Sequence, residues 1–345
     1  MAEISDRPVV FIAVAVIAIL VIGEVIVYTS DSSDYGAEVT MDDGIIEYDL
    51  SSRGSKVFDI VVNDNNGYES VQKLYLYLDT GYASNYGVDE ADVGAAPTDQ
   101  EYYLEQLVQL LEYRCDIETE FVDAAGLREV MDEGVASGDC SGIGLVVVSG
   151  ALPDTVYTGN QDDIVFDWMS LGGTMYWAGG MIGAYYATTE DVHPVSDYQV
   201  LFFGSDCLNT GDTTRAYSVV DSNDYTSVLS LSNNDVTYAV SQGALPEGTP
   251  SLTIGYEEDG YSSITLVGSG SGSIVVFGGQ LGNFQRYDMA QGIASGIGPS
   301  SEIVEHVHGT VSGSASGEIE IGDAGVTVYV YLGGYYPVFG KGFQF

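Results

Sequence analysis

Apolar residues fill positions 9–22 without a break, and the run resumes over 25–28. This is about the ~20 residues that a membrane-spanning helix requires, so it predicts a transmembrane signal-anchor over residues 8–28. Arg7 precedes the run and the next basic residue is Arg53. Because the nearest basic residue lies on the N-terminal side of the run, the sequence predicts a single-pass protein of the cell membrane, with its N-terminus in the cytoplasm and its body outside. A cleaved signal peptide is the alternative, although no small-x-small cleavage site is evident.

Alternating apolar and polar positions mark both ends of the remaining chain. Within the segment 30–70, residues 37–50 and 56–62 are strand-like runs separated by Ser-Ser-Arg-Gly, which predicts a hairpin. The C-terminal segment 301–345 alternates again, with Val at 326, 328 and 330 set between Thr and Tyr. We expect this segment to pack with the hairpin as a small β module.

Between residues 71 and 300, strand-like and helix-like patterns follow one another. The runs GLVVVSG (144–150) and TMYWAGG (174–180) predict buried strands, because strands covered on both faces are apolar at nearly every position. Asp123 can cap a helix, and helical stripes recur over 162–171. The alternation predicts an α/β domain with a three-layer parallel sheet.

The second half of this domain is less regular. The run QVLFF (199–203) is expected to be a strand, and 205–262, rich in Ser, Asn, Asp and Thr, an insertion of loops and short strands. The sequence SSITLVGSGSGSIVVFGG (262–279) predicts two strands around a Gly/Ser turn. A last helix is expected over 287–297.

Charge adds a strong constraint. The chain has 51 acidic and 9 basic residues, a formal net charge of −42, spread along its 345 residues. An acidic, lysine-poor composition with ordinary apolar periodicity predicts adaptation to multimolar salt, as in halophilic archaea, where the Debye length falls to ~3 Å or less. Nucleic acids and anionic lipids are unsuitable partners for such a field.

Two glycine motifs indicate a family. GLVVVSGALP (144–153) is followed by a predicted helix and then by TMYWAGGMIG (174–183). This order resembles the class I glutamine amidotransferase-like superfamily, over about 74–297. There, a strand leads into a G-x-C-x-G elbow that carries a nucleophilic cysteine at a strand-to-helix turn. The resemblance implies a flavodoxin- or amidotransferase-like fold, with a degenerate elbow formed by Gly179, Gly180, Met181, Ile182 and Gly183.

The resemblance also implies that catalysis is lost, in a non-catalytic branch of the superfamily. Met181 stands where the cysteine is expected, and a thioether cannot ionise to act as a nucleophile. The catalytic branch also needs a histidine after a late strand, and none of His193, His306 and His308 has that placement. No catalytic residue and no cofactor are therefore expected.

Other side chains offer alternatives. Cys207 could be a displaced nucleophile, although its acidic neighbours would raise rather than lower a thiol pKa. His306 and His308, two apart on a strand, could chelate a transition metal, but no third ligand is evident and solvent-facing positions explain them as well. Cys115 and Cys140 each precede a predicted strand and could form a disulfide or remain buried thiols.

These observations favour a membrane-anchored binding or scaffold protein outside the cell. Its cleft would lie at the carboxyl ends of the strands, near Asp79, Gly150, Met181 and Tyr185, and would take a ligand or part of an envelope protein or glycan. One alternative is a surface hydrolase that uses Cys207 or a water held by carboxylates. The other is a purely structural component of the cell envelope.

Overall fold

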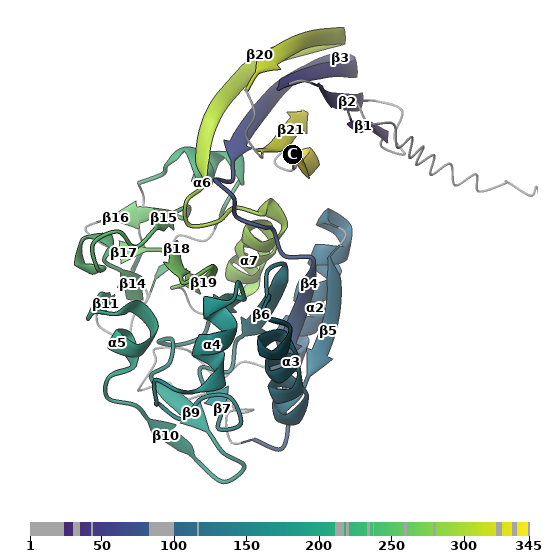
Figure 1. Ribbon diagram of the computed structural model, residues 1–345. Coiled ribbons are helices and arrows are strands. Elements are labelled where there is room, and N and C mark those ends of the chain that lie inside the picture. The colour runs from purple at the N-terminus through teal and green to yellow at the C-terminus, as the bar shows by residue number, and fades with distance from the viewer. Residues whose placement is uncertain are drawn as a thin grey trace, which may run out of the picture.

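The computed structural model describes residues 24–29, 35–42, 44–82, 100–115, 117–210, 217–218, 221–232, 235–236, 238–258, 261–278, 281–321, 326–332 and 337–343. Figure 1 shows an α/β body with a curved β module above it.

A seven-stranded mixed sheet forms the centre of the body. Its strands lie in the order β15 (Ser251–Thr253), β18 (Ile264–Ser269), β19 (Gly272–Phe277), β8 (Thr174–Trp177), β6 (Ile143–Val147), β4 (Lys73–Tyr77) and β5 (Glu118–Val122). The five strands from β19 to β5 are parallel, whereas β18 and β15 run antiparallel to their neighbours. The antiparallel edge arises because Gly270 (φ 64°) and Ser271 close a two-residue hairpin between β18 and β19.

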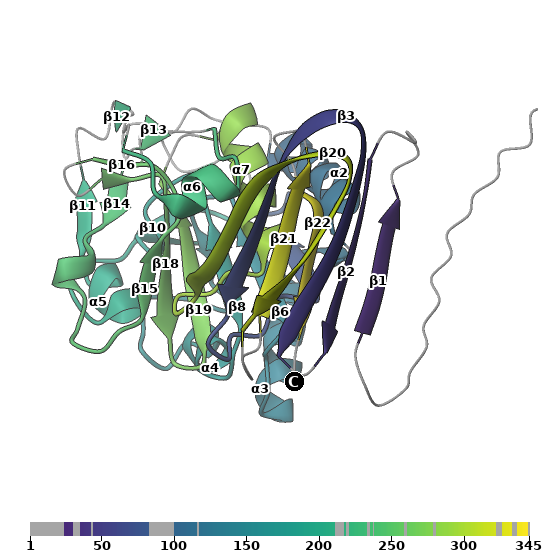
Figure 2. The same ribbon diagram turned by 90° about the horizontal axis from the view of Figure 1, so that it is seen from above.

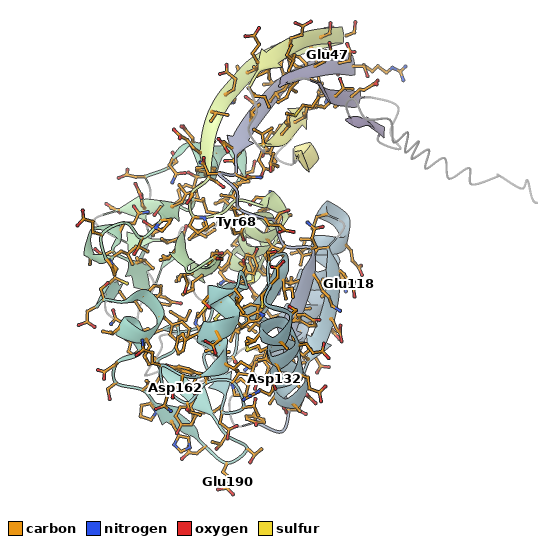
Figure 3. All side chains as sticks on the ribbon, viewed as in Figure 1. Glu47, Tyr68, Glu118, Asp132, Asp162 and Glu190 are labelled. Carbon is orange, nitrogen blue, oxygen red and sulfur yellow. The ribbon has the colours of Figure 1, made fainter. Side chains whose placement is uncertain are left out.

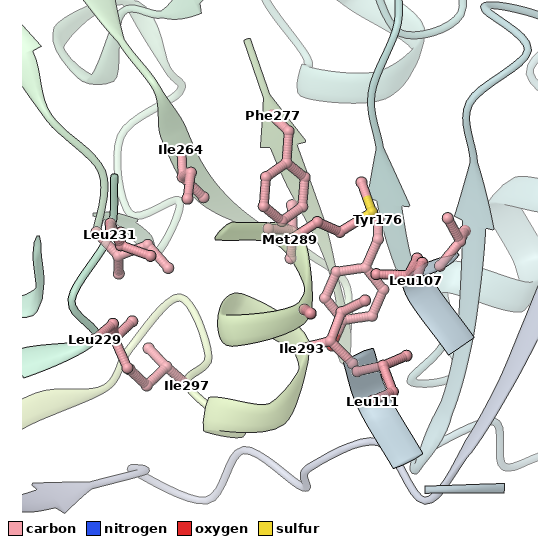
Figure 4. Close-up of a cluster of buried hydrophobic side chains, with 14 of the residues drawn as sticks. Leu107, Leu111, Tyr176, Leu229, Leu231, Ile264, Phe277, Met289, Ile293 and Ile297 are labelled. Carbon is pink, nitrogen blue, oxygen red and sulfur yellow. The ribbon is translucent and has the colours of Figure 1, made fainter. Parts of the chain in front are cut away.

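Helices cover both faces of this sheet. The helices are α2 (Gln100–Arg114), α3 (Ala124–Ser137), α4 (Ile164–Ser170), α5 (Tyr198–Phe203), α6 (Asp224–Val228) and α7 (Asn283–Ser295), with a 3₁₀ turn at Gln242–Ala244. One apolar cluster joins α2 and α7 to the sheet, and Figure 4 shows Leu107 and Leu111 facing Met289 and Ile293 around Tyr176. A second cluster joins α3, α4 and α5 to the opposite face through side chains such as Trp168 and Trp177.

The β module consists of β1 (Glu24–Thr29), β2 (Tyr35–Asp42), β3 (Ile45–Asp64), β20 (Glu302–Glu320), β21 (Val326–Leu332) and β22 (Pro337–Phe343). β20 pairs with β3 from end to end, as Figure 2 shows from above, while β2 and β21 pair with successive halves of β3. The register shifts between Val311 and Gly313, opposite Gly54, and both glycines have positive φ (92° and 96°). Both long strands can bend there, so that their apolar residues enclose a core of their own.

Buried contacts join the β module to the body. Tyr329 and Tyr331 of β21 belong to the same apolar cluster as α7, and the Tyr329 hydroxyl donates to the Ser295 carbonyl oxygen at the end of that helix. The Tyr225 hydroxyl of α6 donates to Asn63 Oδ1 of β3 at 2.8 Å. The module is therefore packed against the body and not merely connected to it.

The described residues also form four small antiparallel or mixed sheets. They are formed by β10 (Val192–Pro194), β9 (Tyr185–Ala187) and β7 (Leu152–Pro153); by β11 (Leu208–Thr210) and β14 (Tyr238–Val240); by β12 (Tyr217–Ser218) and β13 (Asp235–Val236); and by β16 (Glu257–Glu258) and β17 (Tyr261–Ser262).

The predicted fold class, a three-layer parallel sheet of flavodoxin or amidotransferase type with a transmembrane helix, is wrong. The central sheet is mixed, and antiparallel sheets make up much of the rest. Two individual elements of the structure also differ from the prediction. Residues 199–203 lie in α5, because Gly204 (φ 74°) ends a short helix there, and β3 continues through 51–56 where a hairpin turn was expected.

The predicted signal-anchor is also corrected. Residues 24–29, expected at the end of a membrane helix, form β1 and pair antiparallel with β2. Val25, Ile26 and Val27 are β-branched and suit a strand as well as an apolar helix, so the length of the apolar run was a poor guide here. Among the residues described, no helix combines the length and apolar character needed to cross a membrane. The single-pass localisation is therefore not supported; residues 1–23 lie outside the described part of the chain.

Acidic side chains are distributed over the surface. Figure 3 shows Glu47 on the β module, and Glu118, Asp132, Asp162 and Glu190 around the body, all pointing outward. Lys73 contacts Glu118 and Glu120 at 3.2 and 2.8 Å, and Arg128 contacts Asp132 at 2.8 Å. Lys73 and Arg128 are thus each paired with carboxylates.

Buried tyrosines predict a sharp loss of stability in alkali. Burial raises the pKa of Tyr157, Tyr225, Tyr238 and Tyr329 well above the usual value of ~10. The folded chain holds these protons at a pH where the unfolded chain releases them, so the stabilisation is complete below pH ~10 and is lost as the pH rises further. We expect cooperative unfolding above pH ~10, with absorbance at 295 nm and circular dichroism changing together. Gradual titration of all tyrosines with unchanged circular dichroism would contradict this.

Candidate functional site

The carboxyl ends of β4, β6 and β8 form the candidate site. From β4 the chain passes to β5 on one side and then to β6 on the other, so the direction of winding reverses at β4. In open α/β sheets, ligands bind outside the carboxyl ends of strands at such a point. Figure 1 shows this edge at the end of the body opposite the β module, beside β7 and β9.

The turn after β8 carries Met181. Gly179 has φ 85°, and a Cβ there would come within 2.8 Å of the Val148 carbonyl oxygen. The Trp177 indole nitrogen donates to the Gly180 carbonyl at 2.8 Å, and the Tyr198 hydroxyl lies 3.2 Å from the Met181 sulfur. These contacts hold the thioether, which is partly exposed, just beyond the strand end.

This turn is not the strand-to-helix elbow that the sequence predicted. The chain continues into β9, and no helix begins at Met181. Gly183 (φ 71°) is required for a different reason, because a Cβ at this position would overlap the ring of Phe202 on α5. Its carbonyl also accepts a hydrogen bond from the Tyr157 hydroxyl at 2.8 Å.

The other predicted cleft residues reach the same edge but have structural partners. Asp79 accepts hydrogen bonds from Gly81 N at 2.7 Å and from Ala124 N, at the start of α3, at 3.0 Å. Gly150 (φ 75°) turns the chain after β6, and Tyr185 begins β9. Asp79 therefore uses one oxygen for its own loop and the other for the start of α3.

Sequence reasoning missed a polar pair at this edge. The Tyr82 hydroxyl donates to Asp154 Oδ1 at 2.9 Å. Burial, followed by this carboxylate, raises the Tyr82 pKa to about 12, so the phenol remains a hydrogen-bond donor at neutral pH. The two residues follow different strands and no spacing in the sequence relates them.

A cavity of about 260 Å³ lies beside this pair, between α3 and α4. Its charged lining includes Arg128, Asp154 and Asp163. Asp163 accepts from Thr158 N at 2.6 Å and Asn160 N at 2.9 Å, and Arg128 is paired with Asp132. Acidic side chains therefore line the cavity, and Arg128, Asp154 and Asp163 already have partners.

No protein-family model matches this sequence, and no curated protein matches it. Among solved structures, it is similar to the exo-β-1,4-mannosidase Op5Man5 from Opitutaceae bacterium strain TAV5, with a TM-score of 0.34 and 11% identity over 64% of this chain and 33% of the mannosidase. It is also similar to the cytoplasmic protein STM1381 from Salmonella typhimurium LT2, with a TM-score of 0.34 and 12% identity over 64% of this chain and 93% of that one. This chain thus matches about a third of the mannosidase. Similarities at this level carry no argument about function, which depends on the residues themselves.

One histidine stacks on an aromatic ring, and the other two lie on the β module. His193 of β10 stacks on Tyr186 with ring centroids 4.9 Å apart. On β20, His306 Nε2 and His308 Nδ1 lie 3.1 and 2.6 Å from Asp59 Oδ1. Asp59 stands directly opposite His308 in the β3–β20 register, a neighbour that only strand pairing could reveal.

This cluster does not form a metal centre. Across the described ranges, no three His, Cys, Asp or Glu side chains are grouped so that they could hold a metal ion. His306 and His308 both approach the same carboxylate oxygen, and their side chains are 47% and 66% exposed. Hydrogen bonding to Asp59 accounts for their positions.

All three cysteines are free thiols, so the disulfide considered for Cys115 and Cys140 is absent. Cys115 packs against the α2 and α7 cluster, whereas Cys140 belongs to the cluster on the opposite face of the sheet. Cys207 is 1% exposed, and burial raises its pKa to about 11. Its thiolate fraction at pH 7.5 is on the order of 0.03%, which is unfavourable for a nucleophile.

We therefore expect iodoacetamide to modify at most Cys115 in the folded protein at pH 7.5. Cys140 and Cys207 should react only after denaturation, as peptide mass spectrometry of labelled samples would show. Rapid labelling of Cys207 in the folded chain would instead support the hydrolase alternative.

Proposed function

We propose that this chain is a non-catalytic binding protein, a silent relative of the class I glutamine amidotransferase-like superfamily, that holds its ligand at the carboxyl edge of the central sheet. The observation that carries the proposal is Met181. A thioether that cannot ionise lies in the turn after β8, in contact with the Tyr198 hydroxyl. A glycan or part of a protein partner remains a candidate ligand.

The arrangement of the edge supports binding. It lies where the winding of the sheet reverses, and glycine turns let the backbone approach closely after β6 and β8. The hydrolase alternative is less favoured, because Cys207 is buried with a raised pKa and has no hydrogen bond to a histidine among the described residues.

A ligand panel tests the proposal. Neutral glycans, amino acids including glutamine, dicarboxylates and nucleotides would be added to the purified full chain in molar KCl, and unfolding temperatures measured. A true ligand should stabilise the wild type and Met181→Leu, and lose its effect with Met181→Arg, which places a bulky charge at the strand end. Val200→Arg, a change at a half-exposed position on α5, is the matched control and should respond like the wild type.

Two results would overturn the proposal. One is a panel with no ligand whose effect depends on Met181. The other is hydrolysis of glutamine by the purified wild type, since the proposal requires that no such activity exist.

A further inference from the structure

Arg286 differs from Lys73 and Arg128, which are paired with carboxylates. It lies in the first turn of α7, is 8% exposed, and has no carboxylate within ion-pair distance among the described residues. Its Nη2 donates to Asn283 Oδ1 at 2.7 Å, and its Nε has no hydrogen-bond partner in the described part of the chain. A buried guanidinium that lacks a carboxylate partner within the described part of the chain is costly, even though the sequence has 51 acidic residues.

A second buried donor lies next to it. Gln285 is 2% exposed; its Oε1 accepts from the Tyr103 hydroxyl, while its Nε2 has no partner within the described ranges. Nearly all buried polar atoms in native proteins are hydrogen-bonded, so two unsatisfied donors on consecutive residues call for an explanation.

The backbone adds further donors at the same place. Gly282 is the N-cap of α7 and supplies no side-chain acceptor for the free amides of the first turn. Because Arg286 reaches Asn283, the first residue of the helix, its guanidinium lies back over this turn. A helix N-terminus with free amides favours an anion.

The first turn of α2 completes the arrangement. The Arg286 guanidinium lies 5.3 Å from the Tyr103 ring centroid and 5.7 Å from that of Tyr102, which holds its plane in position. Tyr102 and Phe284 are 53% and 69% exposed, and Gly282 and Asn283 are exposed as well. Solvent therefore reaches the end of the helix, with the unsatisfied donors behind it. The acidic neighbour Asp288 is engaged by Ser232, whose N lies 3.0 Å from its Oδ1.

We propose that the first turns of α2 and α7 bind an oxyanion group, a carboxylate or a phosphate, through Arg286, Gln285 and the α7 amides. Guanidinium binds both groups through two parallel hydrogen bonds, and the exposed aromatic rings give the rest of the ligand a surface to stack on. The proposal rests on the proposed function, because it names the chemistry of a ligand at the same edge: Leu281, just before α7, lies against Gly179 of the Met181 turn.

The test uses inorganic phosphate and succinate with the full chain, in KCl at constant ionic strength, by thermal shift and calorimetry. At least one anion should bind saturably to the wild type, and Arg286→Met should weaken its binding at least tenfold. Arg128→Met, which removes an exposed arginine from its pair with Asp132, is the control and should leave binding unchanged. Binding of phosphate only, or of succinate only, identifies which oxyanion the site takes.

Gln285→Glu is a second variant that tests the proposal even if Arg286→Met does not fold. It keeps the size of the side chain and places a carboxylate beside Arg286, so it should raise the unfolding temperature without added anion and abolish the response to the probes. If neither anion binds the wild type saturably, or if Arg286→Met responds as the wild type does, the proposal is overturned. Loss of the anion site alone leaves the dependence on Met181 standing, so the two proposals fail separately.

Discussion

Gly183→Ala is expected to lower the free energy of unfolding by about 3 kcal/mol. Roughly 1–2 kcal/mol comes from placing a Cβ at positive φ, and a similar amount from its overlap with Phe202 on α5. The turn that carries Met181 and the packing of α5 should be disturbed together. Urea unfolding followed by circular dichroism measures the loss.

Gly138→Ala is the matched control for this prediction. Gly138 has φ 77° at the end of α3, and a Cβ there would meet nothing within 4 Å. It should cost only the backbone strain, about 1 kcal/mol. Equal losses in the two variants would show that the contact with Phe202 contributes nothing.

Tyr329→Ala is expected to cost about 3–5 kcal/mol and to loosen the β module from the body. The side chain is buried between β21 and the end of α7, and removing it leaves a cavity and an unsatisfied Ser295 carbonyl. Limited proteolysis should then cut near the junction at concentrations of protease that leave the wild type intact, while urea unfolding gives the free energy.

Tyr329→Phe separates the two contributions. It keeps the ring and removes only the hydroxyl, so a loss of about 1–2 kcal/mol is expected, without enhanced cleavage. A loss with Phe as large as that with Ala would mean that the hydrogen bond, and not the packing, joins the module to the body.

Several helices, strands and turns could be predicted from the sequence because interactions between residues close in the chain determine them. Asp123 caps α3 as predicted, with its carboxylate accepting from Gly126 N, and the apolar runs at 144–150 and 174–180 overlap β6 and β8. The Gly/Ser turn between β18 and β19 was also predicted correctly. Its consequence, an antiparallel edge on the central sheet, contradicts the parallel fold that was inferred from the strands and helices before it.

Only part of the candidate site could be predicted from the sequence. The alternation of strands and helices indicated that Asp79, Gly150 and Met181 would follow strand ends, but not that Asp79 would be used by α3 or that β9 would follow the turn. The resemblance to amidotransferase-like proteins remains a proposal.

The sequence by itself determined several single elements, such as α3, β6 and β8, since periodicity, capping and turn residues act over a few positions. Tertiary structure alone decided the register of β3 against β20, the meeting of His308 with Asp59, and the cluster of Tyr103, Gln285 and Arg286. Each joins residues more than 180 positions apart, and such contacts depend on strand register and helix packing, which no local pattern encodes.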